Sequence, residues 1–273
     1  MRIHNIQVNR VIDFPIITPN TDLSIGTNIQ GPSVIKIPEW IKNPLGAYYL
    51  YFADHKGSYI RLAYADNPLG PWTIYSPGSL HLSESCFLTD APEISQEMLK
   101  EFEVRRQGAA ISHDLLTEIS TPHIASPDVI VDSSNKLILM YFHGLESAGN
   151  QVSRLASSDN GISFRARSAI LGRTYMRVFK YEDETYALSM PGQVYKSVNG
   201  QDDFIEGPLL FNSNMRHSAV LVRDDVLLVF WTQVGDIPES ILLSRIDLTS
   251  HWMDWQAEDA IELLRPEFDW EGA

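Results

Sequence analysis

A chain of 273 residues is long enough for one large domain with a substantial core, and a hydrophobic content of 44% is ordinary for a globular protein. The formal net charge of −14 makes nucleic acids and anionic membrane surfaces poor partners. The single cysteine, Cys86, excludes an internal disulfide, and no apolar run approaches the roughly 18 residues that predict a membrane span. The first residues lack the apolar core of an export signal, so we expect a cytoplasmic protein.

A repeated four-stranded unit organises the sequence. Its first copy predicts strands over 32–37, 48–53 and 59–65, followed by a Gly-Pro-Trp corner at 70–72 that leads into a short fourth strand. Later copies repeat this order of strands, with an aromatic-rich second strand. The first strands start at Gly31, Ser126, Tyr175 and Arg216. With the insertion after Pro77 set aside, the period is roughly 40–50 residues, which predicts propeller blades rather than the alternative of a β-sandwich.

Two segments outside the copies have predicted roles. Residues 3–12 are an apolar strand candidate, which we expect to complete a blade begun at the other end of the chain. An insertion over about 78–121 has helical periodicity at 95–107, with Ser95 as N-cap and Gly108 as the stop, and a second short helix at 112–119 capped by Ser112. We interpret this insertion either as a lid or wall over a pocket or as an interface or surface element.

Four copies and an N-terminal strand do not make five complete blades. We therefore predict a single all-β domain over 1–273, a β-propeller of the five-bladed glycosidase type whose fifth blade is incomplete or composite. An incomplete ring leaves room for a partner chain, so a homodimer is one expectation. Ser157 to Phe164 fits a turn found in many propellers, in which Asp159 accepts backbone N–H bonds, and Ser197 to Phe204 is a weaker copy.

Antiparallel pairing brings the start of each first strand beside the end of each second strand, so both sets of residues collect at one edge. This edge is rich in histidine, arginine and carboxylate side chains. The starts contribute Asn28, Gln30, His123, Asp128, Arg177, Arg216 and His217, and the ends contribute Asp54, His55, His143, Trp231, Gln233 and Asp236. Concave surfaces of this kind suit sugars, so we expect a carbohydrate ligand there.

These residues also have structural interpretations. Asp128 and Arg177 fall at equivalent positions of neighbouring copies and would form an ion pair, while Asp54 would only form a turn. For Trp231, packing between blades is favoured over a platform on which a sugar stacks. The remaining alternatives are a backbone hydrogen bond for His217, a helix cap for His123 and solvation for Asp236.

Three segments resemble known enzymes. GPSVI followed by YYLYFA, and SPDVIVD followed by LILMYFHG, are similar to blades of the five-bladed propeller glycosidases, above all of glycoside hydrolase family 43, and RHSAVLVRDDVLLVFW resembles that family's blade with a channel histidine, here His217. The resemblance implies inverting hydrolysis by an Asp base, a pKa-tuning Asp and a Glu acid, with a cation near His217. The matching positions are Gly31, Ser126 and Thr174 or Tyr175, so no catalytic carboxylate is carried over.

Three functions remain open, of which glycoside hydrolysis comes first. Inverting hydrolysis needs two acid groups about 6.5–9.5 Å apart, and we expect Asp54 and Asp128 to share one edge, with His55, His143 or His217 as the proton donor. The second is a lyase on an acidic polysaccharide, in which arginines at 173, 177 and 216 neutralise a uronate and Tyr175 or a histidine acts as base. The third is a propeller that binds carbohydrate without turnover. No cysteine or histidine cluster has zinc-site spacing, so no cofactor is expected beyond the cation that the resemblance implies.

Overall fold

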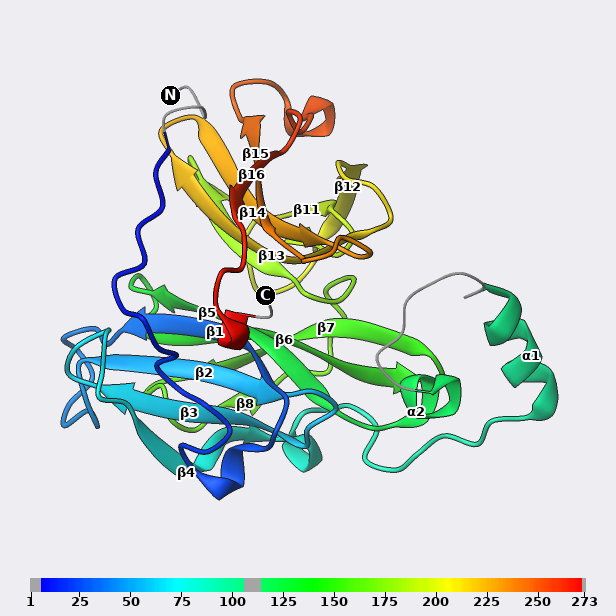
Figure 1. Cartoon of the computed structure of the whole chain (residues 1–273), viewed down its shortest axis with the longest axis horizontal. Helices are drawn as coiled ribbons and strands as arrows, with labels where there is room; N and C mark the ends of the chain where they lie inside the picture. Colours follow the sequence, from blue (N-terminus) through cyan, green and yellow to red (C-terminus); the bar gives the residue numbers. More distant parts are fainter. Residues whose placement is uncertain (1–5, 106–113, 272–273) are drawn as a thin grey trace. The chain divides into compact units, whose positions relative to one another are not determined.

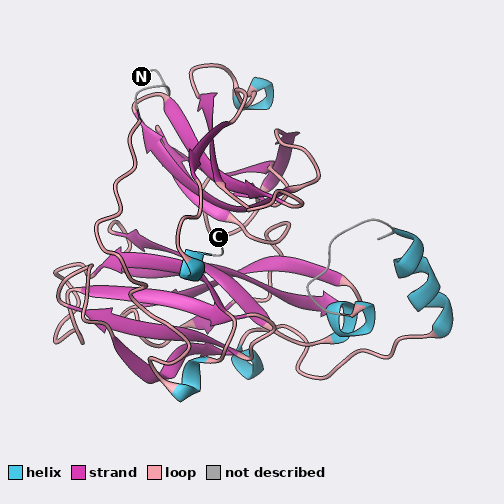
Figure 2. Cartoon of the chain, in the orientation of Figure 1, coloured by secondary structure: helices cyan, strands magenta, loops and turns pink. Residues whose placement is uncertain are grey.

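The computed structural model describes residues 6–105 and 114–271, and most of the regular structure in these ranges is β-strand (Figure 1, Figure 2). Four antiparallel sheets of four strands follow one another along the chain, and neighbours in each sheet are consecutive in sequence. The strands of the first two sheets are β1 (Ile29–Lys36), β2 (Tyr48–Asp54), β3 (Tyr59–Ala65), β4 (Thr73–His81), β5 (Ile124–Asp132), β6 (Leu137–Ser147), β7 (Asn150–Ser158) and β8 (Arg165–Ala166). Those of the last two are β9 (Arg177–Tyr181), β10 (Glu184–Ser189), β11 (Gln193–Ser197), β12 (Ile205–Leu209), β13 (Met215–Arg223), β14 (Val226–Gln233), β15 (Ile241–Asp247) and β16 (Ile261–Leu264).

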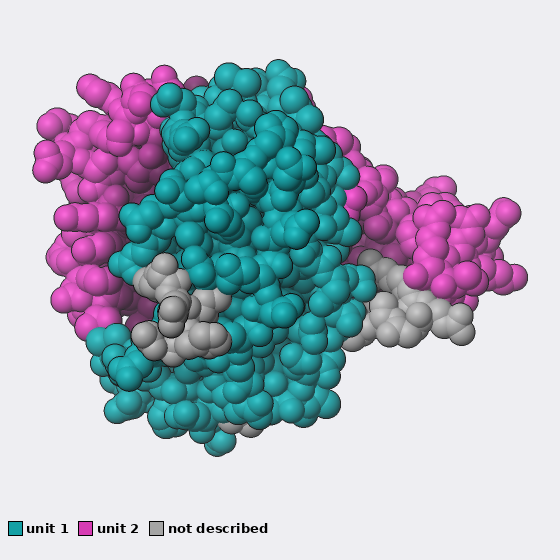
Figure 3. Space-filling view, turned by 90° about the horizontal axis from the view of Figure 1, so that it is seen from above, with its two compact units in different colours: residues 1–15, 175–273 teal, residues 16–174 magenta. Residues whose placement is uncertain are grey.

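The chain forms two compact units, which Figure 3 shows in different colours. Unit 1 comprises Met1–Pro15 and Tyr175–Ala273 and carries the sheets β9–β12 and β13–β16. Unit 2 comprises Ile16–Thr174 and carries the sheets β1–β4 and β5–β8, with helices α1 (Gln96–Arg105) and α2 (Leu115–Ser120). Within each unit the first strands of the two sheets pack together, β1 with β5 and β9 with β13. The inner strands of neighbouring propeller blades are arranged in this way.

The register confirms the predicted blade unit. The strands expected at 48–53 and 59–65 are β2 and β3, and β1 includes most of the strand expected at 32–37. The start of each first strand lies beside the end of the second, since Ile29 pairs with Asp54 in one sheet and Met215 pairs with Gln233 in another. The edge expected to collect polar residues therefore exists in these sheets.

The expectation of a fifth blade is wrong for the part of the chain that the structure describes, which contains four blades. Residues 6–12 form no strand, so the predicted N-terminal strand is also wrong over that range. The reason lies in unit 1, where β16 already occupies the outer position of the last sheet by pairing with β15. The chain's own continuation therefore completes that blade.

The N-terminal segment makes side-chain contacts with the C-terminal segment instead. Arg10 donates from Nε to Glu271 Oε1 at 2.8 Å and from a terminal nitrogen to the carbonyl of Arg265 at 2.9 Å, and it lies 3.2 Å from Glu267 Oε2. Its guanidinium also lies over the Phe268 ring. We call this set of contacts the Arg10 clamp. The clamp joins the two ends of unit 1 without a strand ladder.

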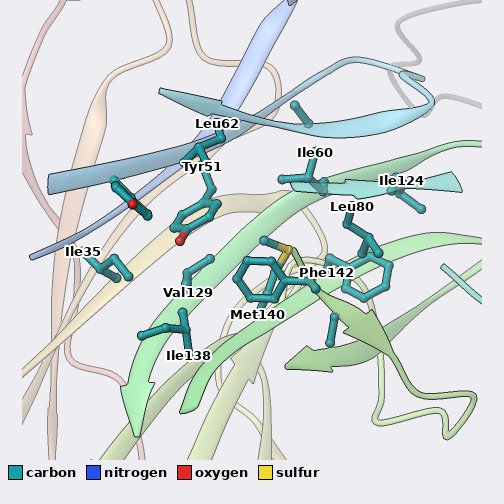
Figure 4. Packing of buried hydrophobic residues seen from close by; sticks show 14 of the residues in the cluster. Ile35, Tyr51, Ile60, Leu62, Leu80, Ile124, Val129, Ile138, Met140 and Phe142 are labelled. Carbon is teal, nitrogen blue, oxygen red and sulfur yellow. The ribbon is translucent and has the colours of Figure 1, made fainter. Parts of the chain in front are cut away.

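The larger core lies in unit 2, between its two sheets (Figure 4). Phe142 is 1% exposed and packs with Ile60, Leu80 and Ile124, all fully buried. Tyr51 joins this cluster, and its hydroxyl donates to the Gly161 carbonyl at 2.6 Å, which satisfies its only buried polar atom. Each such side chain contributes about 1.5–3 kcal/mol by leaving water. This core holds the two sheets of unit 2 together and so fixes the position of their shared edge.

The turn after β7 differs from the predicted one in its key residue. Asn160, not Asp159, accepts the backbone N–H groups of Ile162 and Ser163, at 2.8 and 3.0 Å. Ser158 Oγ accepts from Gly161 N at 2.9 Å. The turn after β11 repeats this pattern with Ser197, Asn199 and Gly200. A side-chain oxygen two residues after the serine is what the turn requires, and an amide supplies it as well as a carboxylate does.

The predicted helices are partly confirmed. Ser95 Oγ accepts from Met98 N at 3.1 Å, as expected for the cap of α1. The cap of α2 is Asp114 rather than Ser112, because the Asp114 carboxylate accepts from Thr117 N at 3.0 Å. Ser112 and the predicted stop at Gly108 lie outside the described residues. Neither described helix is long and apolar enough to cross a membrane.

Candidate functional site

Three first strands share one irregularity close to their start. The pairing with the second strand jumps between Gln30 and Ser33, between Ala125 and Asp128, and between Arg216 and Ala219. Two residues thus lie opposite one, which defines a β-bulge. The first bulge residue has a left-handed backbone in each case, with φ of 63° at Gly31, 50° at Ser126 and 50° at His217. Bulges re-aim side chains and are frequent beside active sites.

The remaining blade has a related feature. Tyr175 precedes Arg177, the first residue of β9, by two positions, as Gly31 precedes Ser33 in β1, and its φ is 57°. We call Gly31, Ser126, Tyr175 and His217 the strand-start residues. A left-handed backbone is strained for any residue but glycine, and such strain is concentrated at functional sites. One residue of each blade is therefore held in the same uncommon conformation.

A buried aromatic side chain lies opposite each of the three bulges. These residues are Phe52, Phe142 and Trp231, which are 4%, 1% and 5% exposed. Trp231 Nε1 donates to Ser244 Oγ at 3.2 Å, and its ring packs edge-on against Phe211. Trp231 therefore packs as its two counterparts do. The structure leaves its ring no exposed face on which a sugar could stack.

The strand-start residues of unit 2 are small and lie against each other. A Cβ on Gly31 would come within 2.9 Å of the Ser126 Cα, so only glycine fits without a shift of the chain. Ser126 is 1% exposed, and its Oγ and Gln30 Nε2 are buried with no hydrogen-bond partner among the described residues. Val129 N donates to Ser33 Oγ at 2.9 Å, which joins the two first strands. Neither strand-start position of unit 2 carries an acid group.

Asp54 is anchored at this edge by the loop before β1. Its Oδ1 accepts from Asn28 N at 2.8 Å, and its Oδ2 lies 4.0 Å from Arg61. Gly26, with φ of 88°, makes room for the carboxylate, since a Cβ there would lie 2.5 Å from the Asp54 carboxyl carbon. The neighbouring His55 donates its backbone N–H to the Asn28 carbonyl at 2.9 Å. These contacts fix the Asp54 carboxylate in one orientation.

Two predicted histidines lie together in the interior of unit 2. His123 and His143 are each 2% exposed, and their rings meet edge-on with centroids 6.1 Å apart. Burial, with the nearby Lys56 charge, lowers the pKa of His123 to about 4, although its hydrogen bond to Thr121 opposes the shift. His123 is therefore neutral at neutral pH. Lys56 itself forms an ion pair with Glu118 of α2 at 3.4 Å, so the helical insertion is attached beside this pair.

Asp128 lies just after the Ser126 bulge and opposite Tyr141. It is half-buried, and Tyr141 is 1% exposed. Burial and the charges of Asp128 and Asp132 raise the pKa of Tyr141. Asp128 and Asp54 thus belong to the same unit and to the edge where its first strands start.

The strand-start residues of unit 1 carry large polar rings. Tyr175 and His217 meet edge-on, with ring centroids 5.3 Å apart and an interplanar angle of 89°. His217 is exposed and Tyr175 is half-buried. Arg177 is 8% exposed, and its Nε donates to the Ser218 carbonyl at 2.8 Å. Arg177 therefore supports the bulge that presents His217.

Arg216, which precedes His217, is paired with a carboxylate. It donates from Nε to Glu239 Oε1 at 2.9 Å and from a terminal nitrogen to Glu239 Oε2. Beside this pair, Gln233 Nε2 donates to Asp236 Oδ1 at 3.2 Å. The sequence predicted Arg216, Gln233 and Asp236 at this edge but assigned Arg216 to the ligand and not to Glu239. The loop after β14 contains two carboxylates, Asp236 and Glu239, and nothing in the sequence indicates which of them pairs with Arg216.

No three His, Cys, Asp or Glu side chains in the described ranges come together as metal ligands. The cation that the resemblance implies near His217 stays a prediction. Of the predicted residues, the structure brings Asn28, Asp54 and His55 together where β1 starts beside the end of β2, His123 and His143 together in the interior, and Gln233 and Asp236 together at the end of β14.

Comparison with known proteins identifies one relative by sequence. No known family profile matches the chain. Uncharacterized protein R118 of Acanthamoeba polyphaga mimivirus is 34% identical over 272 residues, which cover 90% of this chain and 70% of the viral protein. The chain belongs to the family of protein R118.

Solved structures with the same fold are propeller glycosidases. A thermostable family-43 glycoside hydrolase is similar over 89% of this chain and 75% of its own, with 14% identity and a TM-score of 0.55. An α-L-arabinofuranosidase from Clostridium thermocellum matches over 86% and 73%, with 15% identity and a TM-score of 0.53. An endo-1,4-β-xylanase from Bacteroides thetaiotaomicron matches over 87% and 78%, with 12% identity and a TM-score of 0.52. The fold is thus an all-β propeller similar to these structures, with four blades in the described residues.

Proposed function

We propose that the protein binds an oligo- or polysaccharide at the strand-start edge of its blades and hydrolyses a glycosidic bond there. The observation that carries the proposal is the left-handed strand-start residue, which recurs at the start of the first strand in every described blade; in unit 2, Asp54 and Asp128 lie at the same edge as Gly31 and Ser126. The fold supports it, because the similar structures are of enzymes whose names state action on carbohydrates. Fold alone does not fix activity, so the site must carry the argument.

The chemistry requires two acid groups with different roles. In inverting hydrolysis a carboxylate activates water while an acid protonates the leaving oxygen, across about 6.5–9.5 Å. Asp128 is our candidate base, because it follows the Ser126 bulge and is only half-buried. Asp54 is fixed by Asn28 N and lies near Arg61, which suits a group that orients the sugar or the water. His55, which is half-buried, would supply the proton, whereas His123 and His143, each 2% exposed, are too buried to contact a sugar.

The test compares two carboxylate variants on a panel of neutral oligosaccharides, with product detected by chromatography. Asp128→Asn should reduce turnover by at least about a hundredfold, the usual contribution of a general base, while sugar affinity and unfolding temperature stay close to those of the wild type. Asp159→Asn is the matched control, because Asp159 is an exposed carboxylate in the turn after β7 in the same unit. Equal turnover by Asp128→Asn and the wild type would remove Asp128 from the mechanism.

A second function is favoured by a specific observation. The four strand-start residues, Gly31, Ser126, Tyr175 and His217, include no carboxyl group. A propeller that binds carbohydrate without cleaving it needs none. Measurable binding with no product after prolonged incubation would support this function over hydrolysis. An unsaturated uronate product, detected by its ultraviolet absorbance, would instead support a lyase.

A further inference from the structure

The strand-start edge of unit 1 carries two aromatic side chains in contact and, beside them, an arginine whose charge is neutralised by a carboxylate. Tyr175 and His217 both have left-handed backbones, so the fold holds two ring side chains in a conformation that is uncommon for residues other than glycine. Their rings are in contact, and His217 is exposed. A flat ring beside an imidazole suits a sugar, since the ring contacts C–H groups and the imidazole binds hydroxyls.

The adjacent arginine would normally attract a carboxylate ligand. Arg216 directly precedes His217, and planar guanidinium groups bind carboxylates through two parallel hydrogen bonds. Here Glu239 already fills both positions, in the fork-to-fork geometry that a bound uronate would use. The Arg216 and Glu239 side chains are 33% and 26% exposed, so water screens the pair only in part.

The directions in which the pKa values of Arg216 and Glu239 are shifted agree with a stable ion pair. The hydrogen bond with Glu239 raises the pKa of Arg216. Burial opposes ionisation of Glu239, yet its hydrogen bonds with Arg216 and Thr232 outweigh that effect and leave its pKa below the ordinary value. Both groups are therefore charged at neutral pH, and their charges cancel at the edge where His217 lies.

We propose that Glu239 is a specificity-determining residue, which occupies Arg216 and so restricts the Tyr175–His217 edge to uncharged sugars. This inference rests on the proposed carbohydrate site. Two further observations support it. Asp236, hydrogen-bonded to Gln233, adds another carboxylate beside the pair, and the net charge of −14 repels acidic polymers. Arg177 is buried and donates to the Ser218 carbonyl, which leaves Arg173 as the exposed arginine near Tyr175.

Glu239→Gln tests this proposal, because the amide keeps the size of the side chain and removes its charge. Calorimetric binding would be measured with xylotetraose, galactotetraose and tetragalacturonate, of which the last two differ at C6. The wild type should bind at least one neutral tetrasaccharide about tenfold or more tightly than tetragalacturonate. In Glu239→Gln the affinity for tetragalacturonate should rise about tenfold, the value of one charge-assisted hydrogen bond. The double variant with Arg216→Gln should lose this gain.

The matched control is Glu262→Gln, which removes the charge from another ion pair held by two hydrogen bonds. Glu262 accepts from Arg265 Nε at 3.1 Å and from a terminal nitrogen at 2.7 Å, in β16 on the outer side of the same sheet. This control should leave all three affinities unchanged. If Glu239→Gln does not fold, Arg216→Gln alone supplies the test, since it leaves Glu239 uncompensated and should weaken tetragalacturonate binding further.

The outcomes separate this inference from the proposed function. Tetragalacturonate bound by the wild type as tightly as any neutral tetrasaccharide would overturn the role of Glu239 and leave carbohydrate binding standing. A folded Glu239→Gln variant with an unchanged ratio of affinities would do the same. Failure of the wild type to bind any tetrasaccharide would overturn both.

Discussion

Units 1 and 2 use the same strand-start geometry but place different side chains on it. In unit 2, Gly31 and Ser126 lie against each other, and backbone contact between β1 and β5 fills the space. In unit 1, Tyr175 and His217 occupy the equivalent positions. Their rings contact each other, and Tyr175 is half-buried whereas His217 is exposed. The backbone feature therefore belongs to the blade, whereas the chemistry depends on one residue in each copy.

The largest expected effect comes from the aromatic residues opposite the bulges. Phe142→Ala should lower the free energy of unfolding by about 3–5 kcal/mol, because it leaves a cavity in the core of unit 2. Trp231→Phe keeps one ring in unit 1 but loses the bond to Ser244 and part of the buried indole volume, so a smaller loss of about 1–3 kcal/mol is expected. Urea unfolding of each variant measures both values. If Trp231→Phe instead abolished sugar binding while unfolding normally, Trp231 would be a ligand residue after all.

A smaller effect separates the two reasons why position 31 requires glycine, which are its left-handed backbone and its contact with Ser126. Gly31→Ala places a Cβ on a left-handed backbone, which costs about 1–2 kcal/mol, and also forces it against the Ser126 Cα. Gly235→Ala is the control, since Gly235 has φ of 98° and a Cβ there would meet nothing within 4 Å. Chemical denaturation should show a greater loss for Gly31→Ala than for Gly235→Ala. Equal losses would mean that the contact between β1 and β5 is loose.

The smallest effect concerns the Arg10 clamp, which only unit 1 has. The hydrogen bond from Arg10, with those from Glu267 N and Phe268 N, lowers the pKa of Glu271 from 4.5 to about 2. Because the folded pKa lies below the unfolded one, the clamp's contribution is complete above about pH 4.5 and is lost as the pH falls towards 2. Fluorescence of Trp270, which stacks on Phe268, should follow this loss. In Arg10→Gln the same transition should move towards pH 4.5, and an unmoved transition would show that Arg10 does not hold Glu271.

The parts of the fold that the sequence predicted are those with strong local signals. Alternating and aromatic-rich runs such as Tyr48–Asp54 indicated strands, and their repetition indicated blades. Ser95 was identified as a cap because it directly precedes a periodic segment. Choices between neighbours of similar chemistry were less certain, as with Asn160 in place of Asp159, since either side chain can accept the same backbone bonds.

The site was harder to predict because its geometry depends on contacts between distant residues. Nothing in the sequence marks Tyr175 as left-handed, since that conformation is typical of glycine, and the modest preference of histidine for it does not single out His217 among the eight histidines. The pairing of Arg216 with Glu239 depends on how the loop after β14 returns to β13. Asp54 was correctly placed at the strand end, but its bond to Asn28 N follows from a loop conformation with Gly26 at its centre.

The division of the chain has a consequence for how the molecule is made. Unit 2 is one continuous stretch, whereas unit 1 is assembled from residues on both sides of it. A ribosome therefore releases all of unit 2 before most of unit 1 exists, and domains fold as units in the order of their synthesis. Arg10 precedes unit 2 in the sequence, and Glu271 follows it. Synthesis that stops after unit 2 would therefore leave the two blades of unit 2 complete and the Arg10 clamp unformed.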